Sequence, residues 1–165
     1  MKKLNFKTEF EIPVEPKPQT RPKFSKWGTY EDPKMKKWRK QVTGWIEKNY
    51  NGPFFDNCVK VDVTFYMRAP QTLIKEPTAR SKSKTVQIYQ KFINELIWHV
   101  KKPDIDNLVK AVFDSISDAG YDKIQKSGIV WSDDNIVCDL RATKKYSPNP
   151  RIKVKIEEID ERTNG

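Results

Sequence analysis

Residues 59–67 show the most regular pattern in the chain, because every second side chain is apolar. The apolar positions are Val59, Val61, Val63, Phe65 and Met67. Successive side chains of a strand point to opposite faces of a sheet, so this period of two predicts a strand with one buried face. Looser patterns predict further strands over residues 4–14, 136–146 and 152–159.

Two stretches with helical spacing flank this strand. The dipeptide Asp32-Pro33 forms an N-cap and first-turn pair for the first of them. Trp38, Val42 and Trp45 then recur at helical spacing, which is typical of a helix that faces the core. A weaker helical pattern covers residues 81–94.

A third helix is predicted to begin near Asp104 and to end at Gly120. Pro103 disfavours helix for the residue before it, Asp104 can cap the helix, and Gly120 can adopt the left-handed conformation that ends one. The apolar side of this helix consists of Ile105, Leu108, Val109, Val112, Phe113 and Ile116. At about 100° per residue, the other side carries polar residues, which are Asp106, Asn107, Lys110 and Asp114.

The elements follow one another as strand, helix, strand, helix, helix, strand and strand. We therefore expect an α+β fold, with a single domain over residues 1–165 and helices packed on a mixed β-sheet. Several prolines break regular structure before the first helix, so a flexible basic loop is expected at about residues 16–31. A C-terminal tail is expected at about residues 160–165.

The formal net charge of +10 makes a polyanion the first partner to consider. Basic and aromatic side chains are interleaved over residues 19–30, so charges could neutralise phosphates while rings stack on bases. Arg21 and Lys23 are the best candidates for such contacts. The alternative is a solvated loop whose aromatic side chains pack into the core.

Several classes of protein are disfavoured by the composition. One histidine, His99, and two widely separated cysteines argue against a zinc cluster and against a Ser-His-Asp or Cys-His site. No stretch approaches the roughly 20 apolar residues of a membrane span, and the charged N-terminus does not resemble a signal peptide. We therefore expect no membrane association and a cytoplasmic location with reduced thiols.

Two groups of carboxylates are candidate metal ligands. Asp104 and Asp106 lie at the start of the third helix, with Lys110 one turn further on. Asp133 and Asp134 lie in a turn beside predicted strands. Mg²⁺ prefers oxygen ligands and often uses few carboxylates, with water and substrate phosphates completing its coordination. One or two such ions can neutralise a scissile phosphate and activate a water molecule.

Each group also has a purely structural explanation. Asp104 can be a helix cap, and Asp106 with Lys110 can be an exposed ion pair worth ~0.3–0.5 kcal/mol. Asp133 and Asp134 can be ordinary turn residues. Gathering these acids in one place, however, requires a compensating cation.

The two acidic motifs closely resemble those of the RusA family of Holliday junction resolvases, which is common in bacteria and their prophages. The resemblance rests on Lys102-Pro-Asp-Ile-Asp-Asn-Leu-Val-Lys-Ala-Val-Phe-Asp114 and on Trp131-Ser-Asp-Asp-Asn-Ile-Val137. The loop Arg21-Pro-Lys-Phe-Ser-Lys26 and the helix after it are similar to the basic N-terminal part of that family. The linker from Gly120 to Trp131 is longer than in the shortest members.

The resemblance implies a homodimer that binds four-way DNA junctions and cuts symmetrically paired strands with Mg²⁺, or with Mn²⁺ as a substitute. It implies that Asp104, Asp106 and Asp134 are catalytic acids that hold the metal, with Asp133 as the alternative to Asp134. Lys110 matches the essential lysine and would stabilise the phosphate in the transition state.

The expected DNA contacts are Arg21, Lys23, Lys26 and Lys102. Two other functions remain open at this point. A basic protein of this kind could recognise branched DNA without cutting it, or could be a nuclease that acts on flaps, replication forks or RNA. All of these functions would use phosphate contacts, so mapping of reaction products is needed to separate them.

Overall fold

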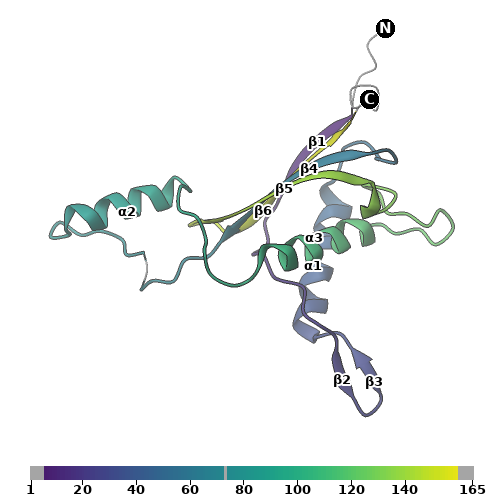
Figure 1. Cartoon of the computed structure of the whole chain (residues 1–165), viewed down its shortest axis with the longest axis horizontal. Helices are drawn as coiled ribbons and strands as arrows, with labels where there is room; N and C mark the ends of the chain where they lie inside the picture. Colours follow the sequence, from purple (N-terminus) through teal and green to yellow (C-terminus); the bar gives the residue numbers. More distant parts are fainter. Residues whose placement is uncertain (1–5, 73, 160–165) are drawn as a thin grey trace, which may run out of the picture.

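Four strands form the central sheet in a computed structural model that describes residues 6–72 and 74–159 (Figure 1). They are β1 (Lys7–Ile12), β4 (Val59–Met67), β5 (Val137–Tyr146) and β6 (Arg151–Glu158). The strand order is β1-β6-β4-β5. β4 runs parallel to β5 and antiparallel to β6, and β6 runs antiparallel to β1, so the predicted mixed sheet of an α+β domain is confirmed.

The strand with the most regular sequence pattern, β4, lies inside this sheet between β5 and β6. Its predicted apolar positions are all buried, and its other residues are exposed or half-buried. Strand β1 begins at Lys7 and ends at Ile12. Within the described residues it is therefore shorter than the strand predicted over residues 4–14. Residues 4 and 5 and the tail expected at 160–165 lie outside the described residues.

Helix α1 (Pro33–Asn49) begins where the sequence predicts. The Asp32 side chain accepts a hydrogen bond from the backbone N–H of Lys34 at 3.0 Å and so caps the helix. The residues of α1 that are buried in the core are Met35, Trp38, Val42 and Ile46. Trp45 is half-buried and stacks on Phe10 of β1, with 6.2 Å between ring centroids.

Helix α3 (Ile105–Asp118) lies beside α1 on the same side of the sheet (Figure 1). Its apolar face packs into the core as predicted, and Gly120 ends it with a φ of +63°. The Gly120 N–H donates to Oε1 of Glu47 at 2.9 Å, which ties the end of α3 to α1. Asp104 occupies the predicted N-cap position, but within the described chain its side chain accepts no capping hydrogen bond.

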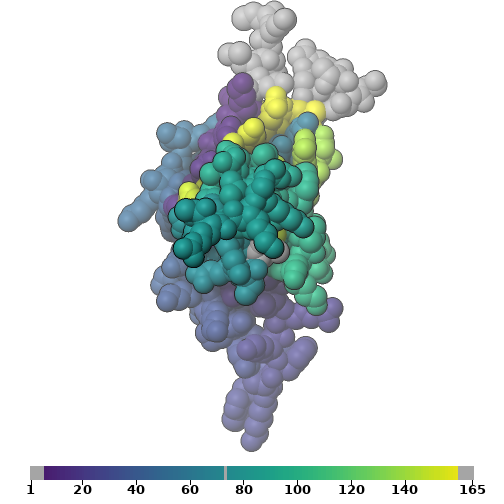
Figure 2. Space-filling model, turned by 90° about the vertical axis from the view of Figure 1, so that its left-hand side faces the viewer, coloured from purple at the N-terminus to yellow at the C-terminus, as the bar shows by residue number. Residues whose placement is uncertain are grey.

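The basic segment predicted as a loop contains a hairpin, formed by β2 (Lys23–Ser25) and β3 (Gly28–Tyr30). Every residue from 21 to 30 is exposed, and the hairpin projects from the molecule beyond α1 (Figures 1 and 2). Its strands are three residues long and show no alternation, so the periodicity that revealed β4 is missing here.

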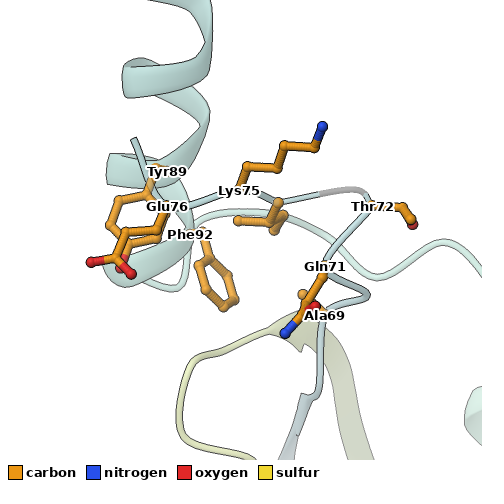
Figure 3. A pocket seen from close by; sticks show the side chains of 8 residues that line it. Ala69, Gln71, Thr72, Lys75, Glu76, Tyr89 and Phe92 are labelled. Carbon is orange, nitrogen blue, oxygen red and sulfur yellow. The ribbon is translucent and has the colours of Figure 1, made fainter. Parts of the chain in front are cut away.

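Helix α2 (Ser83–Ile93) projects on a different side, at the end of two extended segments (Figure 1). The sequence predicted this helix, but none of its residues is buried. Tyr89 and Phe92 line a hollow of about 620 Å³ (Figure 3). The other residues that line it are Ala69, Gln71, Thr72, Ile74, Lys75 and Glu76. Its lining is mixed apolar and polar, and the candidate acids lie elsewhere.

Candidate active site

A second hollow, of about 570 Å³, lies on the polar side of α3. It is lined by residues of α1, of α3, of the segment after α3 and of the turn before β5. These residues are Arg39, Lys110, Asp114, Ser117, Asp118, Tyr121, Lys126, Ser132, Asp133 and Asp134. The lining is dominated by charged groups, which distinguishes this hollow from the one beside α2.

The buried side chain of Trp131 holds the acidic turn against α3. Its ring packs edge-on against Phe113 of α3, with 5.3 Å between centroids. Its Nε1 donates to Oγ of Ser117, also on α3, at 2.8 Å. The next N–H, that of Ser132, donates to the carbonyl of Phe55 at 2.9 Å. The two residues that follow are therefore fixed beside the polar face of α3.

Within this turn, Asp133 caps a short 3-10 helix over Asp134–Ile136. Its Oδ1 accepts the N–H of Asp134 at 2.7 Å. Burial raises the pKa of the Asp134 carboxyl, and the neighbouring Asp133 raises this pKa further. The surroundings of Asp134 therefore oppose the ionisation of its carboxyl group.

Lys110 faces the acidic turn from α3. Its Nζ lies 3.0 Å from Oδ1 of Asp114, one turn further along the helix. This hydrogen bond raises the pKa of Lys110, and the charge of Asp134 adds to the effect. Lys110 is therefore a cation at neutral pH, and its exposed side chain can be reached by a phosphate.

Arg39 of α1 joins the hollow to the two ends of the basic hairpin. Its Nη2 donates to Oε1 of Gln19 at 2.6 Å and lies 3.2 Å from Oε1 of Glu31. The same nitrogen lies 3.9 Å from Oδ2 of Asp114. Sequence reasoning missed Arg39, because its partners are distant in the chain and α1 carries many other basic residues.

Asp118 was also missed by sequence reasoning. It lines the hollow one turn beyond Asp114, and burial raises the pKa of its carboxyl, with Arg39 acting in the opposite direction. The spacing Lys110, Asp114, Asp118 is a signal that could have revealed this acid, since residues four apart share a helix face.

The structure places Asp104 and Asp106 at the N-terminal end of α3, where both are exposed. Neither lines the hollow, although Asp106 lies one turn before Lys110 on the same side of the helix. The segment before α3 is held by Lys144, whose Nζ donates to the carbonyls of Lys101 and Pro103 at 2.8 and 2.7 Å. The structure thus brings Lys110 and the acidic turn to one hollow, whereas Asp104 and Asp106 lie outside its lining.

These residues suit a magnesium ion by their chemistry. The candidate ligands are carboxylates, which Mg²⁺ prefers, and the ion needs only a few of them when water and phosphate supply the rest. Residues 6–72 and 74–159 contain no group of three or more His, Cys, Asp or Glu side chains placed so that they could hold a metal ion. The donor set therefore fits, while a complete cage is not preformed in the described chain.

The candidate DNA contacts are all exposed: Arg21, Lys23, Lys26 and Lys102. The first three belong to the hairpin and its approach, and Lys102 precedes α3. Phe24 and Trp27 are also exposed, so the alternative that these hairpin aromatics pack into the core is wrong. Among the described residues, no helix is both long enough and apolar enough to cross a bilayer.

The chain is similar to known proteins over most of its length. The family model for "Endodeoxyribonuclease RusA" matches residues 13–157, a range that includes the hairpin, α3 and the acidic turn. The chain is also 29% identical, over 129 residues, to "Uncharacterized protein YqaN" of Bacillus subtilis (strain 168). This similarity covers 78% of the chain and 78% of that protein.

Proposed function

Because this chain belongs to the RusA family of endodeoxyribonucleases, we propose that it resolves four-way DNA junctions by Mg²⁺-dependent hydrolysis of two symmetrically placed phosphodiester bonds. The observation that carries this proposal is the hollow on the polar face of α3, which is lined by Lys110 together with Asp133 and Asp134. Asp104 and Asp106, at the N-terminal end of the same helix and outside the hollow, complete the proposed catalytic set.

In this proposal, Asp104, Asp106 and Asp134 hold the metal, with Asp133 as the alternative to Asp134. Mn²⁺ is expected to substitute for Mg²⁺, since both take oxygen ligands. When bound, the ion would neutralise the scissile phosphate and lower the pKa of a water molecule.

Lys110 is proposed to hold an oxygen of the scissile phosphate. Its ion pair with Asp114 directs the ammonium group along α3 and keeps it protonated. Negative charge develops on the phosphate as the reaction proceeds, so a fixed cation there stabilises the transition state more than the ground state.

Binding of the junction is proposed to rely on Arg21, Lys23, Lys26 and Lys102. The net charge of +10 provides a general attraction for DNA. Two symmetric cuts require two copies of the site, so we propose a homodimer whose two-fold axis matches that of the junction.

The test is cleavage of a synthetic four-way junction, with Mg²⁺ and with chelator, beside a linear duplex and a flap. Paired, symmetric nicks that need Mg²⁺ and spare the duplex are the expected result. Tight junction binding without cutting in Mg²⁺ or Mn²⁺ would show instead a protein that only recognises branched DNA. Preferential cutting of the flap would retain the nuclease and overturn the substrate.

A further inference from the structure

Two aromatic side chains on the β2–β3 hairpin are almost completely exposed. Phe24 is 86% exposed and Trp27 is 88% exposed. Leaving large rings in water forfeits the free energy of burying them, so their exposure on a projecting element marks an interaction surface. We propose that Phe24 and Trp27 stack on the base faces that branched DNA exposes at its branch point. This proposal rests on the proposed function and extends it from phosphate contact to recognition of the branch.

The tip of the hairpin has a defined geometry. Trp27 lies in the two-residue turn between the strands, which pair with Phe24 opposite Thr29 and Ser25 opposite Gly28. Oγ of Ser25 accepts the N–H of Trp27 at 3.2 Å and donates to the carbonyl of Gly28 at 3.0 Å. Gly28 has a φ of +118°, which suits glycine. The Trp27 ring is therefore carried by a structured turn.

The charges around the rings favour a nucleic acid over other occupants. Residues 21–30 include Arg21, Lys23 and Lys26 and contain no acidic residue. Nζ of Lys26 lies 5.5 Å from the centroid of the Trp27 ring, so a cation accompanies the stacking surface. Bases stack readily on aromatic side chains whatever their sequence, while nearby cations bind the backbone phosphates.

Stacking of this kind distinguishes branched DNA from linear duplex. The faces of bases inside a duplex are covered by their neighbours, whereas bases at an open branch point or in a single strand expose theirs. The rings should therefore add affinity for branched and single-stranded DNA and add little for duplex.

The base of the hairpin is fixed relative to the acids of α3. Gln19 and Glu31, on the two sides of the hairpin, both contact Nη2 of Arg39. The N–H of Gln19 also donates to the carbonyl of Asn107 on α3 at 2.9 Å. A DNA base that stacks on the tip of the hairpin would thus lie at a fixed position relative to α3, the proposed catalytic helix.

The test compares the affinity of the full-length protein for a four-way junction, a single-stranded oligonucleotide and a linear duplex, by fluorescence anisotropy in chelator. The double variant Phe24→Ala/Trp27→Ala is expected to bind the first two more weakly, by roughly fivefold to a hundredfold for each ring. Its affinity for duplex should stay within about twofold of the wild type. The ring-retaining variant Phe24→Tyr/Trp27→Phe should bind all three like the wild type.

Two controls separate stacking from charge and from a general effect of aromatic exposure. Lys23→Ala/Lys26→Ala should weaken binding of all three DNAs alike, because phosphates are present in each. Trp98→Ala removes a ring that is 59% exposed and has Nζ of Lys145 at 5.0 Å, but lies outside the hairpin. It should leave all three affinities unchanged.

The proposal is overturned if loss of the rings weakens duplex binding as much as junction binding, or leaves all three affinities unchanged. A change in oligomeric state on size-exclusion chromatography would also overturn it, since the rings would then belong to an interface between copies. Failure of the proposed function has a different signature, which is absence of junction cleavage by the wild type in Mg²⁺.

Discussion

Lys110 and Asp134 face each other across the hollow, yet their surroundings act on them differently. The pKa of Lys110 is raised, chiefly by its hydrogen bond to Asp114, so the ammonium form is favoured. The pKa of Asp134 is also raised, chiefly by burial and then by Asp133, so its charged form is less stable there than that of a free carboxyl group. The surroundings thus oppose the charged form of Asp134 but not that of Lys110. A cation bound beside Asp134 would stabilise the carboxylate and lower its pKa.

Asp134 should therefore reduce the stability of the metal-free protein at neutral pH. Because its pKa is higher in the folded than in the unfolded state, ionisation above the unfolded pKa favours unfolding. We predict that Asp134→Asn raises the melting temperature in chelator at pH 7, and that the gain disappears as the pH falls below about 4, where both states hold the proton.

Thermal unfolding followed by circular dichroism across this pH range measures the effect. Asp139→Asn is the control, because Asp139 is an exposed carboxylate on β5 that does not line the hollow. An equal gain at pH 7 and pH 3, or a gain of the same size in the control, would show that burial of Asp134 is not the cause.

At the scale of elements, Arg39 is the contact that links α1, α3 and the hairpin. One nitrogen approaches Gln19, Glu31 and Asp114, which belong to three different parts of the chain. The side chain is largely buried, so replacing it disturbs the orientation of the hairpin more than the surface charge. We propose that Arg39 is a positioning residue, which acts by holding Gln19, Glu31 and Asp114 in place.

We predict that Arg39→Gln slows junction cleavage at saturating protein by roughly tenfold to a hundredfold, because a small misplacement of reacting groups is costly. Affinity for duplex should change little, whereas affinity for the junction should fall because the hairpin is displaced. The ratio of the two affinities should therefore decrease. Arg39→Lys, which keeps the charge near Asp114, should recover part of the rate. Single-turnover kinetics and anisotropy give both quantities, and a uniform loss of binding to every DNA would argue for a merely structural role.

The elements that the sequence predicted well are those with long regular patterns. β4 and α3 each bury one face, so their periods of two and 3.6 are visible in the residues themselves. The hairpin was missed because three-residue strands that bury nothing leave no such pattern. Asp104 takes the predicted N-cap position without the capping hydrogen bond, because a favourable residue at that position does not guarantee the bond.

The candidate site was predictable only in part for a similar reason. Lys110 and Asp134 belong to short motifs that are recognisable locally, and the structure brings them to one hollow. Arg39 depends on contacts between residues far apart in sequence, which local patterns do not encode. Asp104 and Asp106 lie outside that hollow. Their role as metal ligands therefore stays a prediction.

At the scale of the whole molecule, charge and shape act together. The protein carries a net charge of +10, while the hollow gathers acids and the projecting hairpin carries cations. The two groups can serve different functions: the cations of the hairpin can attract the DNA backbone, and the acids of the hollow can attract a metal ion.

DNA binding should accordingly weaken steeply with salt. We predict that neutralising Arg21, Lys23, Lys26 or Lys102 singly lowers the slope of log K against log salt concentration by about one unit for each phosphate that the variant no longer binds. Lys60→Ala, at an exposed position of β4, should leave the slope unchanged. Titrations of a junction at several salt concentrations measure it, and an unaltered slope in all four variants would place the DNA elsewhere.

The central claim is that the acids at the start of α3 and the acid of the turn serve one cleavage site. Its most direct test is single-turnover cleavage of a four-way junction by Asp106→Asn and by Asp134→Asn, with junction binding measured in chelator. Both variants are predicted to lose cleavage by roughly a hundredfold to a thousandfold. Both should bind the junction as well as the wild type or better, because a carboxylate that repels phosphate is gone. Cleavage at the wild-type rate by Asp106→Asn would contradict the claim.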